Sequence, residues 1–263
     1  MIRQVLIFSL LCEFIFCLNI DEIILCDCHS HNDYLNEAPL FNALNHGFKS
    51  IEVDIILYKE SLYVAHHRWQ KRKNKVIEKL YLDTLYKIFL DNNGYIYKND
   101  NSLYLLVDIK TSANDTYIVL DKLLRNYKPM LSRVVNDSVI YGAVTIILSG
   151  NKPKIEYLSN IEERYVFIDG RLSDIGKNIP NSLMPLVSID WTDKFNWRGR
   201  GNLPVEELIT LNEIIFDVHS EGKKLRFWGS PDNEQTWQIL FSSGVDLINT
   251  DKILKLYNFM KKQ

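Results

Sequence analysis

Residues 24–67 read ILCDCHSHNDYLNEAPLFNALNHGFKSIEVDIILYKESLYVAHH and contain two apolar, strand-like runs with polar side chains near the end of each. Residues i and i+2 of a strand share a face, so His29 and His31 point one way, and Glu52 and Asp54 also share a direction. Adjacent carboxylates repel unless a cation lies between them, and oxygen ligands suit Mg²⁺ or Ca²⁺. Imidazoles such as that of His66 carry protons near neutral pH. This stretch therefore predicts a metal-assisted acid/base site.

Apolar runs alternate with helix-period stretches along the rest of the chain, which is typical of a parallel α/β fold. We expect strands near residues 22–28, 49–54, 103–109, 143–149, 164–168, 184–190, 224–228 and 246–249. Helices are expected near residues 38–46, 78–92, 115–126, 153–159, 171–175, 204–221, 232–243 and 251–261. Eight such units predict a (β/α)8 TIM barrel, which needs about 250 residues and carries its active site at the carboxyl ends of the strands. The 263 residues fit one such domain.

The order of the polar residues resembles the glycerophosphodiester phosphodiesterase pattern. That pattern has a histidine after the first strand, here His29, an E-x-D pair on the second, here Glu52 and Asp54, and a further histidine soon afterwards, here His66. The motif HSHNDY at residues 29–34 is similar to the sequences of a subfamily that includes fungal altered-inheritance-of-mitochondria proteins and bacterial phospholipase-C-like relatives. The resemblance extends over most of residues 24–252.

The third expected strand departs from the glycerol-type pattern, which usually has E-x-K at its end. Here Asp108, Lys110 and Thr111 give D-x-K-T, which resembles the sphingomyelinase D branch of the superfamily. Asp108 is expected as a third metal ligand, and Lys110 is expected to neutralise a phosphate oxygen. The alternative is a structural salt bridge at the strand end. Ser30 stands where an arginine is usual, so Lys110, Arg68 or another cation must replace it.

The resemblance implies a metal-dependent phosphoric diester hydrolase. Glu52, Asp54 and Asp108 would hold a divalent Mg²⁺ or Ca²⁺, and His29 and His66 would act as acid and base. A further set of side chains is expected to contact the substrate, a small-molecule phosphodiester or phospholipid head group: His31, Asn32, Arg68, Trp191 and Trp228.

The same residue pattern is compatible with other functions. A phospholipase D or sphingomyelinase D-like reaction, or a phosphoinositide lyase that forms a cyclic phosphate, would use the same residue types. A phospholipid-binding barrel without turnover is another alternative. A His-x-His motif after the first strand is also the first part of the amidohydrolase metal site. Amidohydrolases have further histidines after strands five and six, however, and this chain has none at those positions.

The charge pattern argues against a nucleic-acid partner, because the formal net charge is −2 and the isoelectric point is about 6.3. Residues 67–75, HRWQKRKNK, nevertheless form a basic segment beside the expected site. This segment is expected either to be a solvated loop or to attract anionic substrates and make transient contact with a membrane surface. We expect the protein to be a monomer.

Residues 1–18, MIRQVLIFSLLCEFIFCL, are typical of a secretory signal, with Arg3 before an apolar stretch. A buried N-terminal helix is the alternative, since Glu13 interrupts that stretch. We expect a barrel domain over residues 19–263 and a secreted or periplasmic protein. Cys26 and Cys28 lie two apart on one strand, where bridging is geometrically poor, so we expect two buried thiols.

Overall fold

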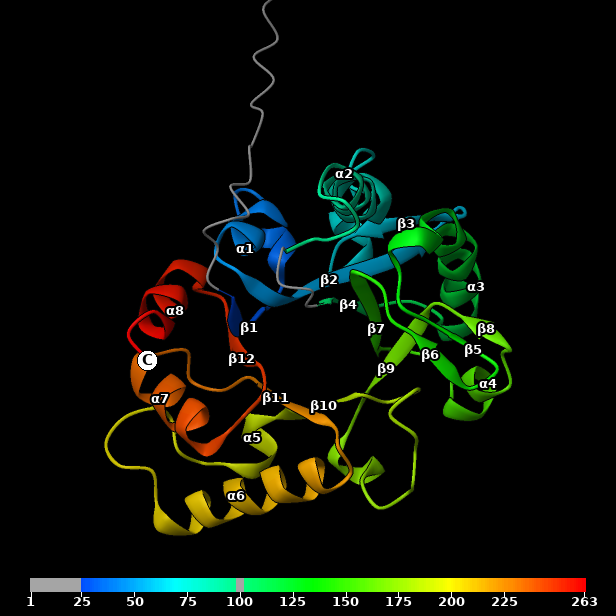
Figure 1. Cartoon of the computed structure of the whole chain (residues 1–263). Coiled ribbons are helices and arrows are strands. Elements are labelled where there is room, and N and C mark those ends of the chain that lie inside the picture. Colours follow the sequence, from blue (N-terminus) through cyan, green and yellow to red (C-terminus); the bar gives the residue numbers. More distant parts are fainter. Residues whose placement is uncertain (1–24, 98–101) are drawn as a thin grey trace, which may run out of the picture.

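The computed structural model describes residues 25–97 and 102–263, and eight parallel strands form a ring at its centre (Figure 1). The strands follow one another around the ring in chain order: β1 (Cys26–Ser30), β2 (Phe48–Tyr58), β4 (Leu103–Ile109), β7 (Val144–Gly150), β9 (Val166–Gly170), β10 (Leu186–Asp190), β11 (Lys224–Trp228) and β12 (Ile248–Thr250). Strand β12 pairs with β1, and a parallel bridge between Arg226 and Leu247 joins β11 to the β12 segment. The expected TIM barrel is therefore confirmed.

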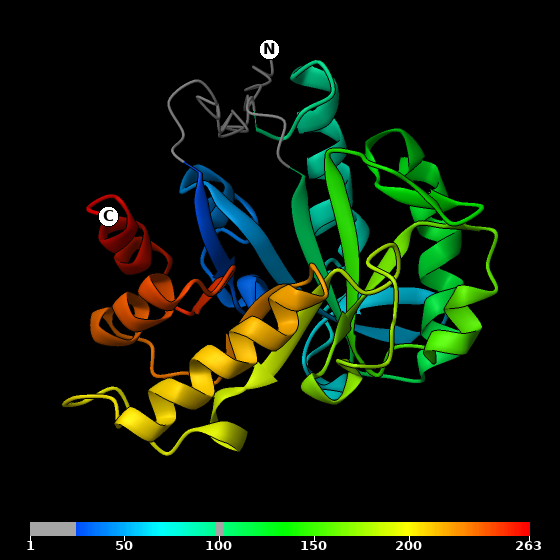
Figure 2. The same cartoon turned by 60° about the horizontal axis from the view of Figure 1, so that its bottom comes forward.

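Helices cover the outside of the ring (Figures 1 and 2). They are α1 (Phe41–Asn45), α2 (Asp83–Asp91), α3 (Ala113–Leu124), α4 (Ile155–Ser159), α5 (Trp191–Lys194), α6 (Val205–Ser220), α7 (Glu234–Ser243) and α8 (Ile253–Met260). A π-helical turn, Glu78–Leu82, leads into α2, and a single 3₁₀ turn, Leu172–Asp174, replaces a helix after β9. No helix in the described ranges is both long and apolar enough to cross a membrane.

Two additions to the barrel were not predicted from the sequence. Strand β3 (Ser61–Val64) pairs antiparallel with the end of β2, so that β2 extends beyond the expected residues 49–54. A separate antiparallel sheet consists of β5 (Arg133–Val135), β6 (Ser138–Ile140) and β8 (Glu163–Arg164). The strands of this sheet have two or three residues each, too few for a side-chain period to be recognised.

Alternation along each strand separates the barrel interior from its helical cover. On β4, Leu106 faces inward with Asp108, and Ile147 on β7 and Phe167 on β9 lie beside it in register. These side chains form a buried cluster with Leu186 and Leu247. Apolar layers of this kind fill the interior of such barrels. The polar side chains near the strand ends therefore rest on a packed apolar floor.

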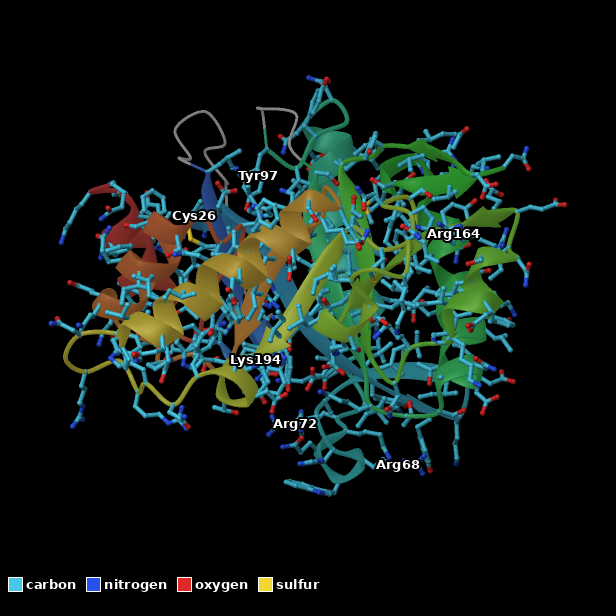
Figure 3. All side chains as sticks on the ribbon, turned by 90° about the horizontal axis from the view of Figure 1, so that it is seen from below. Cys26, Arg68, Arg72, Tyr97, Arg164 and Lys194 are labelled. Carbon is cyan, nitrogen blue, oxygen red and sulfur yellow. A yellow bond between two sulfur atoms is a disulfide. The ribbon has the colours of Figure 1, made fainter. Side chains whose placement is uncertain are left out.

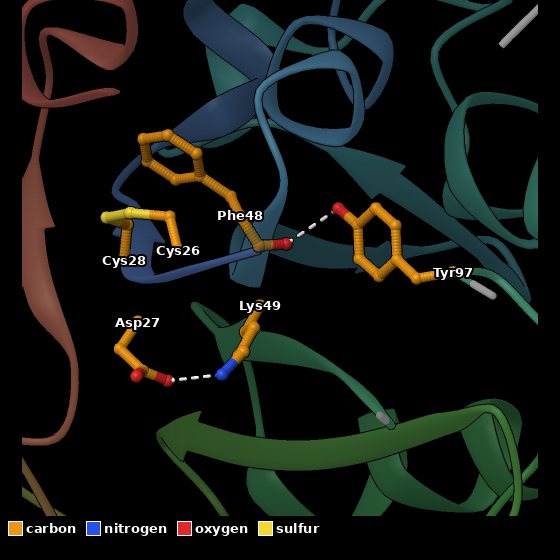
Figure 4. Close-up of a disulfide and its surroundings, with 6 residues drawn as sticks. All are labelled: Cys26, Asp27, Cys28, Phe48, Lys49 and Tyr97. Carbon is orange, nitrogen blue, oxygen red and sulfur yellow. Dashed lines mark hydrogen bonds and ion pairs between the residues drawn. A yellow bond between two sulfur atoms is a disulfide. The ribbon is translucent and has the colours of Figure 1, made fainter. Parts of the chain in front are cut away.

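The two cysteines of β1 form a disulfide, which contradicts the expectation of unbridged thiols (Figure 4). Residues two apart on a regular strand are separated by roughly 6.6 Å, but the Cα atoms of Cys26 and Cys28 are 5.1 Å apart. The cause is an irregularity in β1, because Cys26 pairs with Phe48 whereas His29 pairs with Ser50. The extra residue in β1 shortens the spacing to one that a disulfide spans.

Candidate active site

A continuous layer of polar side chains crosses the closure of the barrel, at the join between its last and first strands. Its centre is Arg226 on β11, whose guanidinium lies 2.7 Å from Glu52 Oε2, 3.0 Å from Ser188 Oγ and 3.2 Å from Asn249 Oδ1. It also lies against Nε2 of His29. Five strands contribute to this layer: β10, β11, β12, β1 and β2. All five side chains are buried, so the layer sits inside the mouth of the barrel.

His29 is fully buried and fixed from both ring nitrogens. Its Nδ1 lies 2.7 Å from Ser50 Oγ, and its Nε2 lies 3.0 Å from Glu52 Oε2. Burial and the neighbouring charge of Arg226 lower the pKa of His29 to about 4. Burial alone would raise the pKa of Glu52, but the charge of Arg226 and the hydrogen bond with His29 outweigh it and hold that pKa below its usual range. Glu52 is therefore a carboxylate and His29 a neutral imidazole near pH 7.

Glu52 also belongs to a group of three carboxylates that converge at this layer. Oxygens of Glu52, Asp54 and Asp108 all lie within 4.8 Å of one another. Parallel pairing brings Asp54 and Asp108 together, because they are direct neighbours in the register of β2 and β4. One oxygen of each, Asp54 Oδ1 and Asp108 Oδ1, is buried and has no hydrogen-bond partner within residues 25–97 and 102–263. Buried oxygens left in this way cost free energy, and a hard divalent cation is the partner that such a donor set fits.

The second oxygen of Asp54, Oδ2, is in contrast heavily engaged. The Tyr34 hydroxyl donates to it over 2.9 Å, His66 Nδ1 lies at 2.6 Å, and Lys110 Nζ lies at 3.4 Å. Lys110 also lies 3.0 Å from Asp108 Oδ2. His66 is about half exposed and is thus oriented by Asp54 while its ring remains accessible to water. Asp54 therefore uses Oδ2 to position two candidate catalytic groups, His66 and Lys110, whereas its Oδ1 has no hydrogen-bond partner in the part of the chain that the structure describes.

Most of the expected substrate contacts surround this site. His31 lies 2.8 Å from Asp251 and 3.8 Å from Glu52, and Asn32 contacts its ring. Burial alone would lower the pKa of His31, but the hydrogen bond with Asp251 and the charge of Glu52 outweigh it and raise this pKa. Trp228 ends β11 with its side chain part exposed, and Arg68 lies on the exposed turn after β3.

The expected contact between Trp191 and the substrate is contradicted. Its ring is fully buried, packs against Phe195 and Phe227, and donates from Nε1 to the Trp197 carbonyl. The ring belongs to the apolar core and not to the group of polar side chains that forms the site. The short helix α5 begins at Trp191, directly after β10, and its indole packs into the core.

Sequence reasoning missed Arg226 and Tyr34. A signal for Arg226 was present, because it is the one charged residue between apolar Leu225 and Phe227 and shares a face with Trp228. Tyr34 belongs to the HSHNDY stretch but was given no role. Ser30, which stands where an arginine is usual, is fully buried and donates to Asp33 Oδ1 over 2.9 Å.

Comparisons of the sequence with known proteins identify a family and several relatives. A sequence model of the AIM6-like phosphodiesterase domain matches residues 19–169. The altered inheritance of mitochondria protein 6 homolog of Arthroderma benhamiae is 26% identical over 86% of this chain and 81% of that protein. The altered inheritance of mitochondria protein 6 of Kluyveromyces lactis is 28% identical over 91% of this chain and 73% of that protein.

Two solved structures also align with the barrel. The phosphatidylinositol-specific phospholipase C from Listeria monocytogenes aligns with a TM-score of 0.49 at 13% identity, over 90% of this chain and 92% of that one. A glycerophosphodiester phosphodiesterase from Agrobacterium tumefaciens aligns with a TM-score of 0.48 at 11% identity, over 89% of this chain and 97% of that one.

Proposed function

Because this chain belongs to the AIM6-like phosphodiesterase family, we propose that its barrel mouth hydrolyses phosphodiesters with a divalent ion, Mg²⁺ or Ca²⁺, and a pair of histidines. The observation that carries this proposal is the set of three converging carboxylates, two of which keep a buried oxygen that no described residue of the chain hydrogen-bonds. The residues that would hold the ion are Glu52, Asp54 and Asp108.

The balance of formal charge supports a phosphodiester as the substrate. Three carboxylates face two cations, Lys110 and Arg226, so this group carries one net negative charge. A divalent ion would reverse this to one net positive charge, which opposes the single negative charge of a phosphodiester. Attraction of this kind is strong in a site that excludes water.

Each protein group then has a definite task. When bound, the ion would act as a Lewis acid toward a non-bridging phosphoryl oxygen. One histidine of the pair His29 and His66 takes a proton from the nucleophile, and the other gives a proton to the departing alkoxide. Lys110 lies beside the acid cluster, the group formed by Glu52, Asp54 and Asp108. Its ammonium neutralises charge that develops on the phosphoryl oxygens.

Arg226 is the cation that replaces the arginine expected after His29. Ser30 occupies that position and directs its hydroxyl to Asp33, away from the acid cluster. The guanidinium arrives instead from β11 and contacts His29 and Glu52. Its planar donors suit a phosphate oxygen as well as a carboxylate.

The test is a substrate screen with the purified protein. Glycerophosphodiesters, phosphatidylinositol, lysophospholipids and sphingomyelin would each be incubated with Ca²⁺, with Mg²⁺ or with a chelator, and ³¹P NMR would identify the products. We expect ion-dependent loss of at least one diester resonance, abolished in Asp54→Asn. A cyclic phosphate would identify intramolecular attack, and a phosphomonoester direct hydrolysis. Unchanged spectra with every substrate and ion would refute the proposal.

A further inference from the structure

We propose that the barrel mouth docks on an anionic lipid surface through residues 67–75, termed here the basic turn. This turn follows β3 and carries five cations and no carboxylate. Its cations are Arg68, Lys71, Arg72, Lys73 and Lys75. None of them forms an ion pair with a residue in the ranges 25–97 and 102–263; Lys71 instead lies 3.9 Å from the centre of the Tyr58 ring. The turn therefore presents uncompensated positive charge.

The basic turn also displays an indole in a fixed orientation. Trp69 is 78% exposed, and its ring stacks on that of His67 with centroids 5.4 Å apart and an interplanar angle of 25°. The turn is closed by a hydrogen bond from the His67 amide to Gln70 Oε1, 2.8 Å long. An ordered turn that holds a tryptophan in water has little conformational freedom left to lose when that ring enters an interface.

Further exposed cations and apolar side chains lie at the same end of the molecule. Figure 3 places Arg68, Arg72 and Lys194 at one end of the molecule, opposite Cys26 and Tyr97. Because Cys26 begins β1, the end with the three cations is the carboxyl end of the strands, where the candidate active site opens. The rim carries further exposed apolar side chains, Leu35 just after β1 (73% exposed) and Trp228 at the end of β11. Cations around exposed tryptophan and leucine are the combination that membrane interfaces favour.

A bilayer explains this face better than a nucleic acid does. Tryptophan stacks on bases as readily as it enters an interface, but the aliphatic side chain of Leu35 gains nothing from stacking. The chain as a whole is slightly acidic, so the basic turn, with five cations and no carboxylate, is a local excess of positive charge. Local positive charge on a neutral or acidic protein favours an oriented approach to an anionic surface.

The basic turn is in physical contact with the acid cluster. The ring of His67, on which Trp69 stacks, meets the ring of His66 at 4.4 Å and 81°. His66 in turn lies 2.6 Å from Asp54. Docking would therefore bring lipid head groups to the site and restrain the turn that adjoins His66. That the head group is cleaved there rests on the proposed function, whereas docking itself does not.

The experiment measures co-sedimentation of the full chain with vesicles of phosphatidylcholine alone and of phosphatidylcholine with phosphatidylserine. The variants are Trp69→Ala and the pair Arg72→Gln with Lys73→Gln. The matched control is Lys261→Gln with Lys262→Gln, which removes two exposed lysines that follow α8. These lysines lie at the opposite end of the barrel from the basic turn, because the ring of Tyr257 in α8 packs on His46, just before β2 begins.

We expect the wild type to sediment with phosphatidylserine vesicles and to be released by salt. Each lost cation should weaken binding about fivefold, and the Arg72/Lys73 pair about 25-fold. Trp69→Ala should weaken it about tenfold, and the control pair should bind like the wild type. The proposal would be overturned if the protein bound both vesicle types equally, or if the turn variants bound like the wild type. It would also be overturned if poly(U) RNA displaced the protein from the vesicles by binding the same side chains. Vesicle binding without cleavage of any diester would support docking and overturn only the proposed function.

Discussion

Replacing Arg226 by methionine tests whether this residue and a divalent ion are alternative counter-charges for Glu52. Both side chains are buried, and the guanidinium lies 2.7 Å from the carboxylate. Removing one partner of such a buried pair leaves an uncompensated charge and typically costs about 3–5 kcal/mol. For a domain of this size each kcal/mol lowers Tm by about 2–4 °C, so Arg226→Met should melt about 6–20 °C lower in the presence of a chelator.

The decisive measurement is how far a divalent ion reduces the loss of stability caused by Arg226→Met. An ion bound by Glu52, Asp54 and Asp108 restores positive charge beside Glu52, so Ca²⁺ or Mg²⁺ should stabilise Arg226→Met more than it stabilises the wild type. Ion at about 100 times its Kd stabilises a single site by about 2.7 kcal/mol, which sets the scale of the recovery. Urea unfolding followed by tryptophan fluorescence, with chelator and with each ion, measures both the loss of stability in Arg226→Met and its recovery by the ion.

Two controls separate charge compensation from simple packing. Arg164 is also buried, but its guanidinium donates to the Ser182 carbonyl and pairs with no carboxylate among the described residues. Arg164→Met should therefore lose stability by an amount that no ion changes. In the second control, Glu52→Gln combined with Arg226→Met should be less destabilised than the sum of the two single variants. Additive losses, or an Arg226→Met protein as stable as the wild type without ion, would refute the reasoning.

Four further outcomes are expected. Lys110→Ala should slow turnover by about 10²–10³ with little change in Tm, because one donor aimed at developing charge is worth about 2.7–4 kcal/mol of barrier; unchanged activity or a collapsed Tm would make Lys110 structural. Asp54→Asn should weaken ion binding in calorimetric titration, whereas His66→Ala should keep the ion and lose about 10²–10⁴ in rate; the reverse pattern would exchange these roles. Asn233→Ala should cost about 1 kcal/mol of stability in urea unfolding, because Asn233 Oδ1 accepts from the Thr236 amide at the start of α7. Mass spectrometry of the native protein should find residues 1–18 removed, and an intact Met1 would count against export.

The barrel and the placement of its acids followed from short-range patterns. The E-x-D spacing predicts a common direction for Glu52 and Asp54, and β-pairing sets Asp108 beside Asp54. The order of His29, the acids and His66, together with HSHNDY, indicated the family that the comparisons confirm. Each of these signals lies within one strand or its adjoining turn, where a period of two residues is enough to fix the direction of a side chain.

The features that escaped prediction depend on contacts between distant parts of the chain. The shared face with Trp228 marks Arg226 as a candidate, but its contact with Glu52 depends on the position of β11, three strands from β2 in the barrel. Trp191 was placed at the mouth because it follows a strand, but α5 turns it into the core. The Cys26–Cys28 disulfide depends on a register irregularity between β1 and β2, which no residue pattern within β1 reveals.

The polar layer across the barrel closure has a consequence for the order of folding. His29, Glu52, Asp54, His66, Asp108 and Lys110 all lie in the first half of the chain, whereas Arg226 is 174 residues from Glu52. Contacts of such sequence separation form late, because the connecting chain must first lose its freedom. Until β11 docks, the early half of the barrel carries an acid cluster with Lys110 as its nearby cation. A divalent ion bound as proposed by the three carboxylates would reduce their mutual repulsion before Arg226 arrives, and so would favour folding of this half of the chain.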